Sequence, residues 1–430
     1  MCIRDSHLSA RPTGRRFRVE VRYALHLARP ARWIELHAAE LEIGDVEVSV
    51  GDQCHRGRVE MHAECETVRL HFDKRLPAGP CTLSLSARGT IRNDLRGLYR
   101  GSSRKLPWIA TQLCPTDARR LFPCFDEPGF KARYTVRVTA PSDQLVLSNA
   151  PVASRQSRPD GRSTVVFHPT PPLSVYLLAI AIGPFEASRA RRVGRTTIRV
   201  VTLPGERPLG RFALRAAAES LARLERWFGM PHPYAKLDLV ALPDFAFGAM
   251  ENAGAVFFRD SIMLLDERDA SAEDRFRAAE TIAHELAHMW FGNLVTMAWW
   301  NDLWLNESFA TWMAYEIVDD WQPRWKSWHA FIARREAALE LDALRTSHPI
   351  APPVKTAEEA QENFDAITYA KGAAVLRMLQ RYMGAASFRA GVRRYVRRHR
   401  EGTAEASDLW RALEDASSLP VETIVRPWIT

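Results

Sequence analysis

The stretch at residues 281–291, TIAHELAHMWF, decides how the rest of this 430-residue sequence is interpreted. It contains His284, Glu285 and His288. On a helix, side chains four residues apart lie on one face, one turn apart, so both imidazoles can reach a single ion. Glu285 then lies beside that ion, where its carboxylate can take a proton from water. The stretch therefore indicates a helix that offers two metal ligands and a general base, although taken alone it is equally typical of an ordinary helix surface.

The residues that flank this stretch also indicate a helix. Ser271, followed three residues later by Asp274, forms a capping box, and the interior is rich in Ala and Glu. Gly292 and Asn293 are typical of the end of a helix. We expect the helix to begin after Ser271 and to end near Gly292.

A second helical segment at residues 304–312, WLNESFATW, offers Glu307 as a third ligand. The distance from His288 along the chain allows a helix, a turn and a returning helix. Taken alone, Glu307 is more typical of a carboxylate at a helix start, where the helix dipole favours it. Beside the histidine pair it completes a His2Glu set that leaves the fourth tetrahedral position to water, as in catalytic zinc sites. The set favours one Zn2+ per chain, although it does not distinguish zinc from cobalt or manganese added in vitro.

Two periodicities divide the chain. Residues 17–201 alternate apolar and polar positions with a period of two, broken by Pro and Gly clusters. This pattern predicts an antiparallel β domain, with strands at residues 17–25, 68–72, 81–85, 134–138 and 164–168.

After residues 203–205 the period becomes that of a helix, first at residues 212–224. A short strand at residues 236–242 and then mostly helices are expected to follow. We therefore predict an α+β, multidomain fold with domains at residues 1–203 and 204–430, which agrees with the length of the chain.

Composition argues against two classes of partner. The formal net charge is +8, but the basic residues are scattered and accompany no zinc-finger or single-strand-binding motif. The densest basic run, at residues 393–400, is expected to be a solvated helix face. The longest apolar run, at residues 172–185, is short and interrupted, so we predict no membrane span. Neither nucleic acid nor a membrane is expected as a partner.

The cysteines and the start of the chain favour a reducing, cytoplasmic location. All six cysteines lie in the first third of the chain without Cys-x-x-Cys spacing, which indicates scattered thiols rather than a disulfide framework or a metal site. Residues 1–16 lack the apolar segment of a signal peptide. The first six residues, MCIRDS, resemble a translated sequencing artefact, and we expect the first strand to begin at residue 17.

Several motifs together resemble one family. HELAH, followed after eighteen residues by Glu307, is the gluzincin arrangement, and GAMEN at residues 248–252 is the exopeptidase motif of M1 aminopeptidases. Three further stretches resemble the same family: TQ at 111–112 with DARRLFPCFDEP at 117–128, WWNDLWLNE at 299–307, and DAITYAKG at 365–372. The sequence is thus identified as similar to the M1 zinc metalloaminopeptidases, of the aminopeptidase N type, over nearly its whole length.

The resemblance implies a fold and also which part of that fold these residues lack. It implies an N-terminal antiparallel β domain followed by a thermolysin-like, mainly helical catalytic domain with a small sheet. It also implies a large C-terminal helical domain, which is absent from these residues. We therefore expect a fragment whose activity is weakened or lost.

The resemblance also implies an activity, the zinc-dependent removal of the first residue from peptides with a free N-terminus. Zinc on His284, His288 and Glu307 would activate water, while Glu285 takes the proton and delivers it to the leaving amine. Tyr369 would donate a hydrogen bond to the developing oxyanion.

Five residues are implied to bind the substrate. Glu251 would pair with the α-ammonium group, so that a peptide without one leaves a buried charge unpaired. Gln112, in the β domain, would assist at the same amine. The backbone at Gly248 and Ala249 would align the substrate as an added strand, and Met250 would line the pocket for the first side chain.

Two other functions remain open at this point. The leukotriene hydrolase branch uses the same zinc scaffold to open epoxides, although GAMEN rather than GGMEN favours peptide hydrolysis. A noncatalytic scaffold of the same family is the other alternative, and the presence of all the catalytic groups argues against it. Zinc content and hydrolysis of an amino-acid anilide, compared with its N-acetylated form, distinguish the three.

Overall fold

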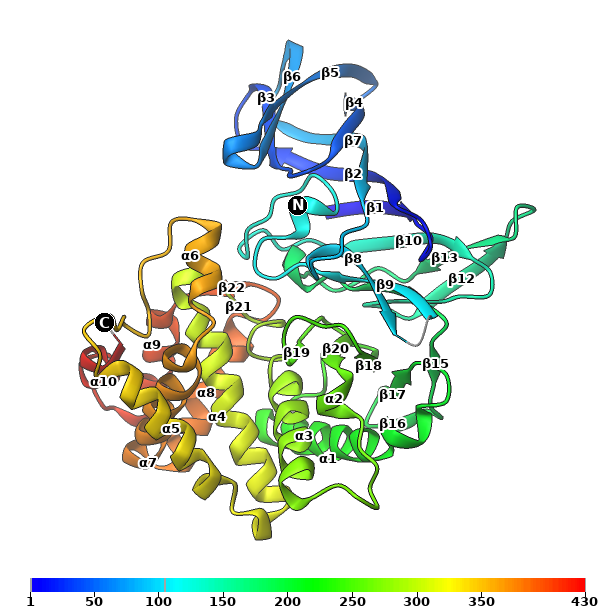
Figure 1. The fold of residues 1–430 in the computed structure, drawn as a ribbon. Helices are drawn as coiled ribbons and strands as arrows, with labels where there is room; N and C mark the ends of the chain where they lie inside the picture. The colour runs from blue at the N-terminus through cyan, green and yellow to red at the C-terminus, as the bar shows by residue number, and fades with distance from the viewer. Residues whose placement is uncertain (1, 104–105, 430) are drawn as a thin grey trace. The chain divides into compact units, whose positions relative to one another are not determined.

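The computed structural model describes residues 2–103 and 106–429 of the chain (Figure 1). It contains two compact units, of which the first comprises Met1–Glu186, Pro243–Ala246 and Asn252–Ala255, and the second comprises Ala187–Leu242, Phe247–Glu251 and Val256–Thr430. Strands dominate the first unit and helices the second. The predicted order, a β-rich domain followed by a mainly helical one, is confirmed.

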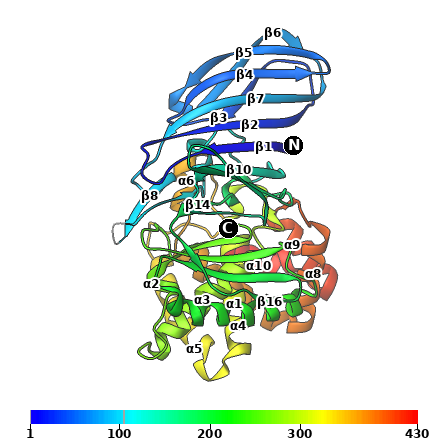
Figure 2. The same cartoon turned by 90° about the vertical axis from the view of Figure 1, so that its right-hand side faces the viewer.

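Two sheets form the described part of the first unit, as the two views show (Figure 1, Figure 2). One has ten strands in the order β12-β13-β10-β1-β2-β7-β4-β5-β6-β3, and the other has four in the order β11-β14-β9-β8. The larger sheet consists of β1 (Cys2–Ser9), β2 (Arg16–Leu27), β3 (Ala31–His37), β4 (Glu42–Val50), β5 (Gln53–His62), β6 (Thr67–Leu76), β7 (Gly79–Thr90), β10 (Tyr134–Pro141), β12 (Val152–Ser157) and β13 (Arg162–Phe167). The smaller sheet consists of β8 (Gly97–Ser103), β9 (Leu106–Gln112), β11 (Leu145–Ser148) and β14 (Ile180–Gly183).

The second strand, β2, illustrates why this sequence forms a sheet. Its apolar side chains from Phe17 to Leu25 are buried at every second position, while most of the intervening side chains are exposed. Such alternation places one face of a strand on the core and the other in solvent. The strand predicted at residues 17–25 is therefore confirmed.

The expectation that the first strand begins at residue 17 is wrong. Strand β1 precedes it, pairing antiparallel with β2 and parallel with β10. Only Leu8 and Ser6 of its last four residues are buried, so the apolar alternation is too short to be recognised. The strand is held by backbone hydrogen bonds to one neighbouring strand on each side, and a sequence pattern does not reveal such bonds.

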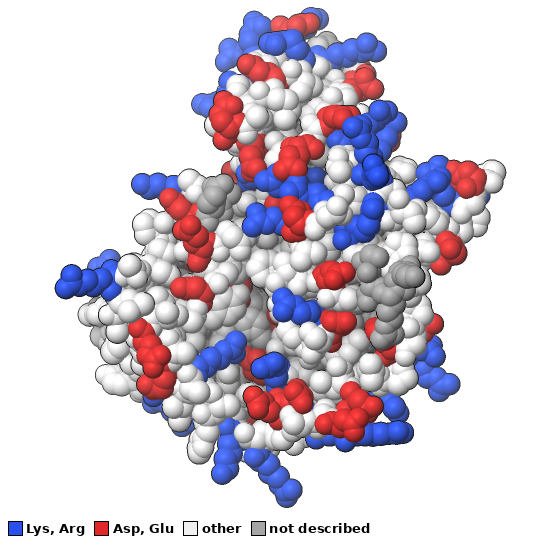
Figure 3. Space-filling view, viewed as in Figure 1, with Lys and Arg blue, Asp and Glu red and all other residues white. Residues whose placement is uncertain are grey.

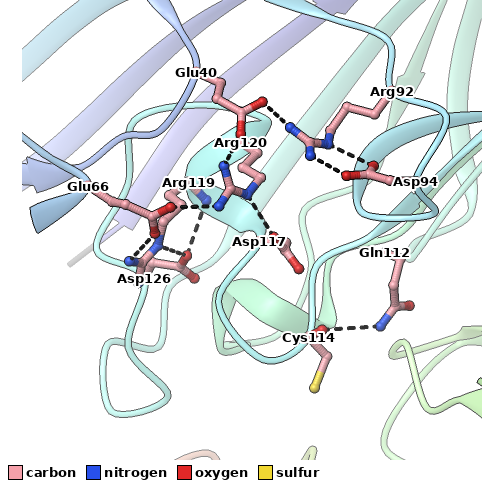
Figure 4. Close-up of polar contacts among 10 residues, drawn as sticks. All are labelled: Glu40, Glu66, Arg92, Asp94, Gln112, Cys114, Asp117, Arg119, Arg120 and Asp126. Atoms are coloured by element: carbon pink, nitrogen blue, oxygen red, sulfur yellow. Dashed lines mark hydrogen bonds and ion pairs between the residues drawn. The ribbon is translucent and has the colours of Figure 1, made fainter. Parts of the chain in front are cut away.

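The stretch DARRLFPCFDEP contributes to a partly buried ion-pair cluster (Figure 4). The Arg119 guanidinium donates to Asp126 at 2.9 Å and to Glu66 at 3.0 Å. The Arg120 guanidinium donates to Glu66 at 2.6 Å and to Asp117 at 2.9 Å. Because each charge has a partner, burial of these groups is tolerated. The cluster thus ties residues 117–126 to Glu66, which lies just before β6.

The second unit is built on a sheet in the order β15-β17-β18-β20-β19, with β16 paired to β17. Its strands are β15 (Glu186–Ala187), β16 (Arg191–Val193), β17 (Thr196–Thr202), β18 (Lys236–Leu242), β19 (Ala249–Met250) and β20 (Ala255–Arg259), and a separate pair is formed by β21 (Thr296–Met297) and β22 (Thr403–Ala404). Its α-helices are α1 (Arg211–Phe228), α2 (Asp260–Met263), α3 (Ala272–Ala287), α4 (Leu303–Trp321), α5 (Ser327–Asp342), α6 (Ala357–Glu362), α7 (Gly372–Met383), α8 (Ala385–Arg398), α9 (Ala406–Ser417) and α10 (Val421–Ile429).

Helices α1, α3 and α4 pack together and hold the centre of the second unit. Aromatic rings fill the space between them, with Phe228 stacked on Trp290 at a centroid distance of 4.9 Å and Phe291 stacked on Phe309 at 3.5 Å. These rings contribute a large buried apolar area. The helix predicted at residues 212–224 and the strand predicted at residues 236–242 are confirmed as α1 and β18.

The first division between the two compact units lies earlier in the chain than the predicted boundary after residue 203. Strand β17 pairs in parallel with β18, so it belongs to the sheet of the second unit, and the first division falls between Glu186 and Ala187. The assignment of domains to residues 1–203 and 204–430 stays a prediction.

Charged side chains are spread over the surface of the protein. Helix α8 contains most of the basic run at residues 393–400, and Arg394, Arg397 and Arg398 are exposed. Basic and acidic side chains are interspersed on the face that Figure 3 shows. Within the described residues, no helix is both long enough and apolar enough to cross a bilayer.

Five cysteines are described as free thiols. Cys54 and Cys65 are exposed, and Cys81, Cys114 and Cys124 are buried. The side chain of Cys2 lies outside the described part of the chain.

Candidate metal centre

Helix α3 presents the histidine pair. Its predicted capping box is confirmed, because the Asp274 N–H donates to the Ser271 hydroxyl at 3.0 Å and the Ser271 N–H donates to the Asp274 carboxylate at 2.9 Å. The cap satisfies backbone N–H groups that the first turn of a helix leaves without partners. His284 therefore lies in the last turn of a helix whose start is well defined.

The predicted end of this helix near Gly292 is wrong, since α3 ends at Ala287. The N–H groups of Met289 and Trp290 donate to carbonyl oxygens three residues back, at 3.2 and 3.1 Å. This tighter winding replaces the α-helical pattern over the residues that follow His288. The chain can then turn sharply at Gly292, where φ is +124°.

Three ligand atoms converge from two helices. The Nε2 atoms of His284 and His288 lie 3.0 Å apart. A carboxylate oxygen of Glu307, in the second turn of α4, lies 3.3 Å from each Nε2. All three atoms lie within 4.8 Å of one another, and this group could hold a metal ion.

The other nitrogen of each imidazole also has a partner. His288 Nδ1 lies 3.1 Å from the carbonyl oxygen of Phe291, and His284 Nδ1 lies 3.4 Å from the hydroxyl oxygen of Thr311. A proton on each Nδ1 leaves each Nε2 as the free acceptor, which is the form that binds metal. No sequence motif pointed to Thr311, although its place four residues after Glu307 puts both on one face of α4.

The charges of the site strongly shift the ionisation of its groups. Burial disfavours the charged form of His288, but the carboxylates of Glu307, Glu251 and Glu285 outweigh burial and raise the pKa of His288 to about 10. Burial lowers the pKa of His284. Burial would raise the pKa of Glu307, but the two imidazoles outweigh it and lower that pKa to about 2. The site therefore holds Glu307 as a carboxylate and has excess negative charge for a cation.

Two further carboxyl groups surround this set. Glu285 is buried, and its Oε2 atom has no hydrogen-bond partner among the described residues. Burial, together with the nearby Glu251 and Glu307 charges, raises the pKa of Glu285 well above its usual value. Burial also raises the pKa of Glu251 to about 6. Buried carboxyl groups crowded in this way are typical of a site that binds cationic groups.

Glu251 is held in place through its backbone. The Asn293 side-chain amide donates to the Glu251 carbonyl oxygen at 2.8 Å. Asn293 follows the sharp turn at Gly292, so the segment after the histidine helix also anchors the GAMEN stretch. Nothing in the sequence pattern pointed to this contact, because the two residues are far apart along the chain.

The residues Gly248, Ala249 and Met250 lead into Glu251 along the edge of the sheet. Ala249 pairs with Phe258 and Met250 with Phe257, and the Arg259 N–H donates to the Gly248 carbonyl oxygen at 2.9 Å. Strand β19 is the last strand in the order of this sheet. An edge strand offers backbone groups to which an extended peptide can add.

Tyr369 lies on a π-helical turn, η7 (Ile367–Lys371). Its ring stacks on the imidazole of His284 with a centroid distance of 5.9 Å and an angle of 10° between the planes. Desolvation, the charges of Glu307 and Glu251, and a hydrogen bond to Glu307 raise the pKa of Tyr369 well above its usual value. The hydroxyl therefore stays protonated and can donate a hydrogen bond.

Gln112 belongs to the first unit, whereas the other predicted site residues belong to the second. It is buried at the end of β9, and its side-chain amide donates to the Cys114 carbonyl oxygen at 3.3 Å (Figure 4). Its role at the substrate amine stays a prediction.

Comparison with known proteins agrees with this picture. The Peptidase family M1 domain matches residues 212–428, and the Peptidase M1 N-terminal domain matches residues 3–177. Aminopeptidase M1-A of Oryza sativa subsp. japonica is 40% identical over 425 residues, which cover 96% of this chain and 48% of the relative. Aminopeptidase M1 of Arabidopsis thaliana is 39% identical, over 94% of this chain and 47% of the relative.

A further relative shows the same similarity. Leucyl aminopeptidase of Saccharolobus solfataricus is 41% identical over 338 residues, which cover 78% of this chain and 42% of the relative. The chain thus spans about half the length of the curated relatives it matches. With one domain model matching each half of the chain, the protein belongs to peptidase family M1.

Proposed function

We propose that this protein is a zinc-dependent aminopeptidase that hydrolyses the first peptide bond of peptides with a free N-terminus. The observation that carries this proposal is the convergence of His284, His288 and Glu307 within 4.8 Å. The aminopeptidase names of the relatives support it. The scattered cysteines further favour a reducing, cytoplasmic location.

The donor set fits zinc. Ligand atoms bound at about 2.0–2.2 Å in a tetrahedral zinc site lie about 3.3–3.6 Å from one another. Two of the three separations here are 3.3 Å, and the third is 3.0 Å. Two imidazole nitrogens and one carboxylate oxygen are the ligands of many catalytic zinc sites. Bound zinc supplies Lewis-acid activation of water and of the substrate carbonyl group.

Glu285 is proposed to move the proton. A general base must reach the water from which it takes the proton, and a carboxylate oxygen free of protein partners is able to do so. Glu285 Oε2 is such an atom among the described residues. After the attack, the same carboxyl group can return the proton to the leaving amine nitrogen.

Tyr369 and Glu251 are proposed to bind two groups of the first residue of the peptide, its reacting carbonyl oxygen and its α-ammonium group. The Tyr369 hydroxyl, stacked beside His284, can donate to the oxygen that gains negative charge. The buried Glu251 carboxyl group can pair with the α-ammonium group of the first residue. A peptide blocked at its N-terminus lacks that partner, so its binding leaves Glu251 unpaired and is disfavoured.

The backbone beside Glu251 is proposed to align the peptide. Gly248 and Ala249 lie at the edge of the sheet, where an extended chain can add as a strand. Met250 is buried beside them and is proposed to contact the first side chain. We also propose that Gln112 assists at the amine.

The test is hydrolysis of leucine p-nitroanilide by the purified chain, with N-acetyl-leucine p-nitroanilide as the matched control. We expect weakened but measurable turnover of the free amine, at least about 100-fold less turnover of the acetylated compound, and loss of turnover with a chelator. Zinc should restore the activity. Equal hydrolysis of both compounds, or activity that persists after complete metal removal, would contradict the proposal.

A further inference from the structure

The π-helical turn that carries Tyr369 is held at its start by Asp365. The Asp365 carboxylate accepts the Thr368 N–H at 3.0 Å, and its carbonyl oxygen accepts the Tyr369 N–H at 3.0 Å. At its end, the Gly372 N–H donates to Ile367, five residues back. Such single π turns often occur at functional sites, because they change the direction of a side chain within a helix.

A buried hydrogen bond joins this turn to the helix of Glu307. The Ser308 hydroxyl donates to the Thr368 carbonyl oxygen at 2.5 Å. Ser308 is fully buried and directly follows Glu307, while Thr368 directly precedes Tyr369. One hydrogen bond therefore links the neighbours of a candidate metal ligand and of a candidate oxyanion donor.

The two segments also approach very closely. A Cβ atom built on Gly372 would lie 1.9 Å from the Ser308 hydroxyl oxygen and 2.8 Å from the Ser308 Cβ atom. Any side chain at residue 372 would push the turn away from α4. The absence of a side chain there lets the hydroxyl reach the carbonyl oxygen of Thr368.

The direction of the serine bond is informative. A serine inside a helix often donates to a carbonyl oxygen of its own helix, three or four residues back. Ser308 instead donates across to η7, so its hydroxyl connects two elements rather than closing a local turn. Removing it leaves a buried carbonyl oxygen without this donor, which favours movement of the turn.

We infer that Ser308 is a positioning residue. It holds the Tyr369 hydroxyl in its place beside the ligand set of His284, His288 and Glu307. The inference rests on the proposed function and assigns a role to a side chain that does not itself touch the reacting atoms. It predicts that Ser308 affects turnover only through Tyr369.

The test compares S308A with S327A in the zinc-loaded chain. Ser327 is also fully buried, and its hydroxyl lies 3.0 Å from both the Tyr315 carbonyl oxygen and an Asp319 carboxylate oxygen, so S327A removes at least as much hydrogen bonding to the same helix α4. We expect S308A to lower kcat for leucine p-nitroanilide about 10- to 100-fold, because small displacements of a catalytic group are costly. KM should change less than about twofold in S308A, and S327A should retain the wild-type kcat.

A double-mutant cycle with Y369F separates positioning from general damage. If Ser308 acts through Tyr369, adding S308A to Y369F should change kcat by less than about twofold. An equal loss in both backgrounds, an equal loss in S308A and S327A, or reduced zinc content in S308A would overturn the inference.

A readout without turnover completes the test. Amide hydrogen exchange of a peptide that spans residues 365–373 should be at least about tenfold faster in S308A than in wild type or S327A, with and without zinc. Unchanged exchange overturns the inference by itself. A wild-type chain that binds no zinc overturns the proposed function, whereas normal turnover by S308A, or unchanged exchange in S308A, overturns only the role of Ser308.

Discussion

At the scale of single residues, the site depends on which carboxylate oxygen lies close to the two imidazole Nε2 atoms. Glu285 and Glu307 are both buried carboxyl groups beside the same imidazoles. Glu307 Oε2 lies 3.3 Å from both Nε2 atoms and belongs to the candidate ligand set, whereas Glu285 does not belong to it. The same side-chain type can thus serve as a ligand at one position and as a proton carrier at the other.

The first prediction concerns Glu285. The E285Q variant should bind zinc with wild-type stoichiometry, because Glu285 is not in the ligand set. Its kcat should fall by about 10²–10⁴, the usual contribution of a general base. The measurements are zinc content by atomic absorption and kcat with leucine p-nitroanilide.

The control for this prediction is E273Q, which changes an exposed glutamate at the start of the same helix. It should keep both the metal and the activity. Wild-type turnover by E285Q, or loss of its zinc, would show that Glu285 has a different role.

The second prediction concerns Thr311, whose hydroxyl oxygen lies 3.4 Å from His284 Nδ1. Valine has nearly the same shape as threonine, but its side chain cannot accept a hydrogen bond from the Nδ1–H group. The T311V variant should therefore bind zinc about 10- to 100-fold more weakly, as when the outer partner of a ligating histidine is lost. Competition with a chromophoric chelator measures the affinity.

The matched control is T281V. Thr281 lies on α3, and its hydroxyl donates to the Arg277 carbonyl oxygen of its own helix at 3.0 Å. This variant should bind zinc as wild type does. An affinity for T311V equal to that of T281V would rule out a role for Thr311 in orienting His284.

At the scale of elements, the types of α1, α3 and β18 and the start of α3 were predictable, whereas the end of α3 and the π turn were not. The capping box fixed the start of α3, because Ser271 and Asp274 act locally. The same helix ended five residues before Gly292, because packing after His288 favours a tighter turn. The π turn at Ile367–Lys371 had no signal in the sequence, since its winding depends on contacts with α4.

The third prediction concerns the capping box of α3. The S271A variant removes the oxygen that accepts the Asp274 N–H, so it should lower the free energy of unfolding by about 0.5–2 kcal/mol. Urea unfolding followed by circular dichroism measures the change. S261A is the comparison, because Ser261 is exposed and caps no helix. Equal stability of S271A and wild type would show that tertiary packing alone holds this helix start.

At the scale of the whole molecule, a buried histidine links stability to pH. His232 is fully buried, its Nδ1 lies 2.9 Å from the Tyr234 carbonyl oxygen, and its Nε2 has no partner among the described residues. Burial lowers the pKa of His232 to about 4 from the usual 6.5. The folded protein therefore keeps this imidazole neutral at pH values where the unfolded chain already binds a proton.

The fourth prediction follows from this difference. The unfolded chain takes up a proton as the pH falls through 6.5, and the folded protein does so only near pH 4. The contribution of His232 to stability should therefore fall between these values, by about 2 kcal/mol from pH 7 to pH 5, and level off below pH 4. Urea unfolding at the two pH values, followed by tryptophan fluorescence, measures the effect.

The variant H232N provides the control, because asparagine can still donate to the Tyr234 carbonyl oxygen but does not titrate. H232N should be less stable than wild type at pH 7, and its stability should change less between pH 7 and pH 5. An unaltered pH dependence in H232N would assign the acid sensitivity to other groups.

Sequence alone determined the features that depend on neighbours along the chain. The spacing of His284 and His288 places both on one helix face, and the alternation from Phe17 to Leu25 makes a half-buried strand. The motifs around Glu251, Glu307 and Tyr369 resembled a family, which the domain models then matched. These features follow from helix and strand periods and from recognisable motifs.

Only the tertiary structure decided which distant groups meet. It brought Glu307 to within 3.3 Å of both imidazoles, set Thr311 beside His284, joined Ser308 to Thr368 and paired β1 with β10. Each of these contacts involves residues far apart along the chain, so its formation depends on how whole elements pack. Burial also set the pKa of His232, because its desolvation is a property of the folded core rather than of the residue.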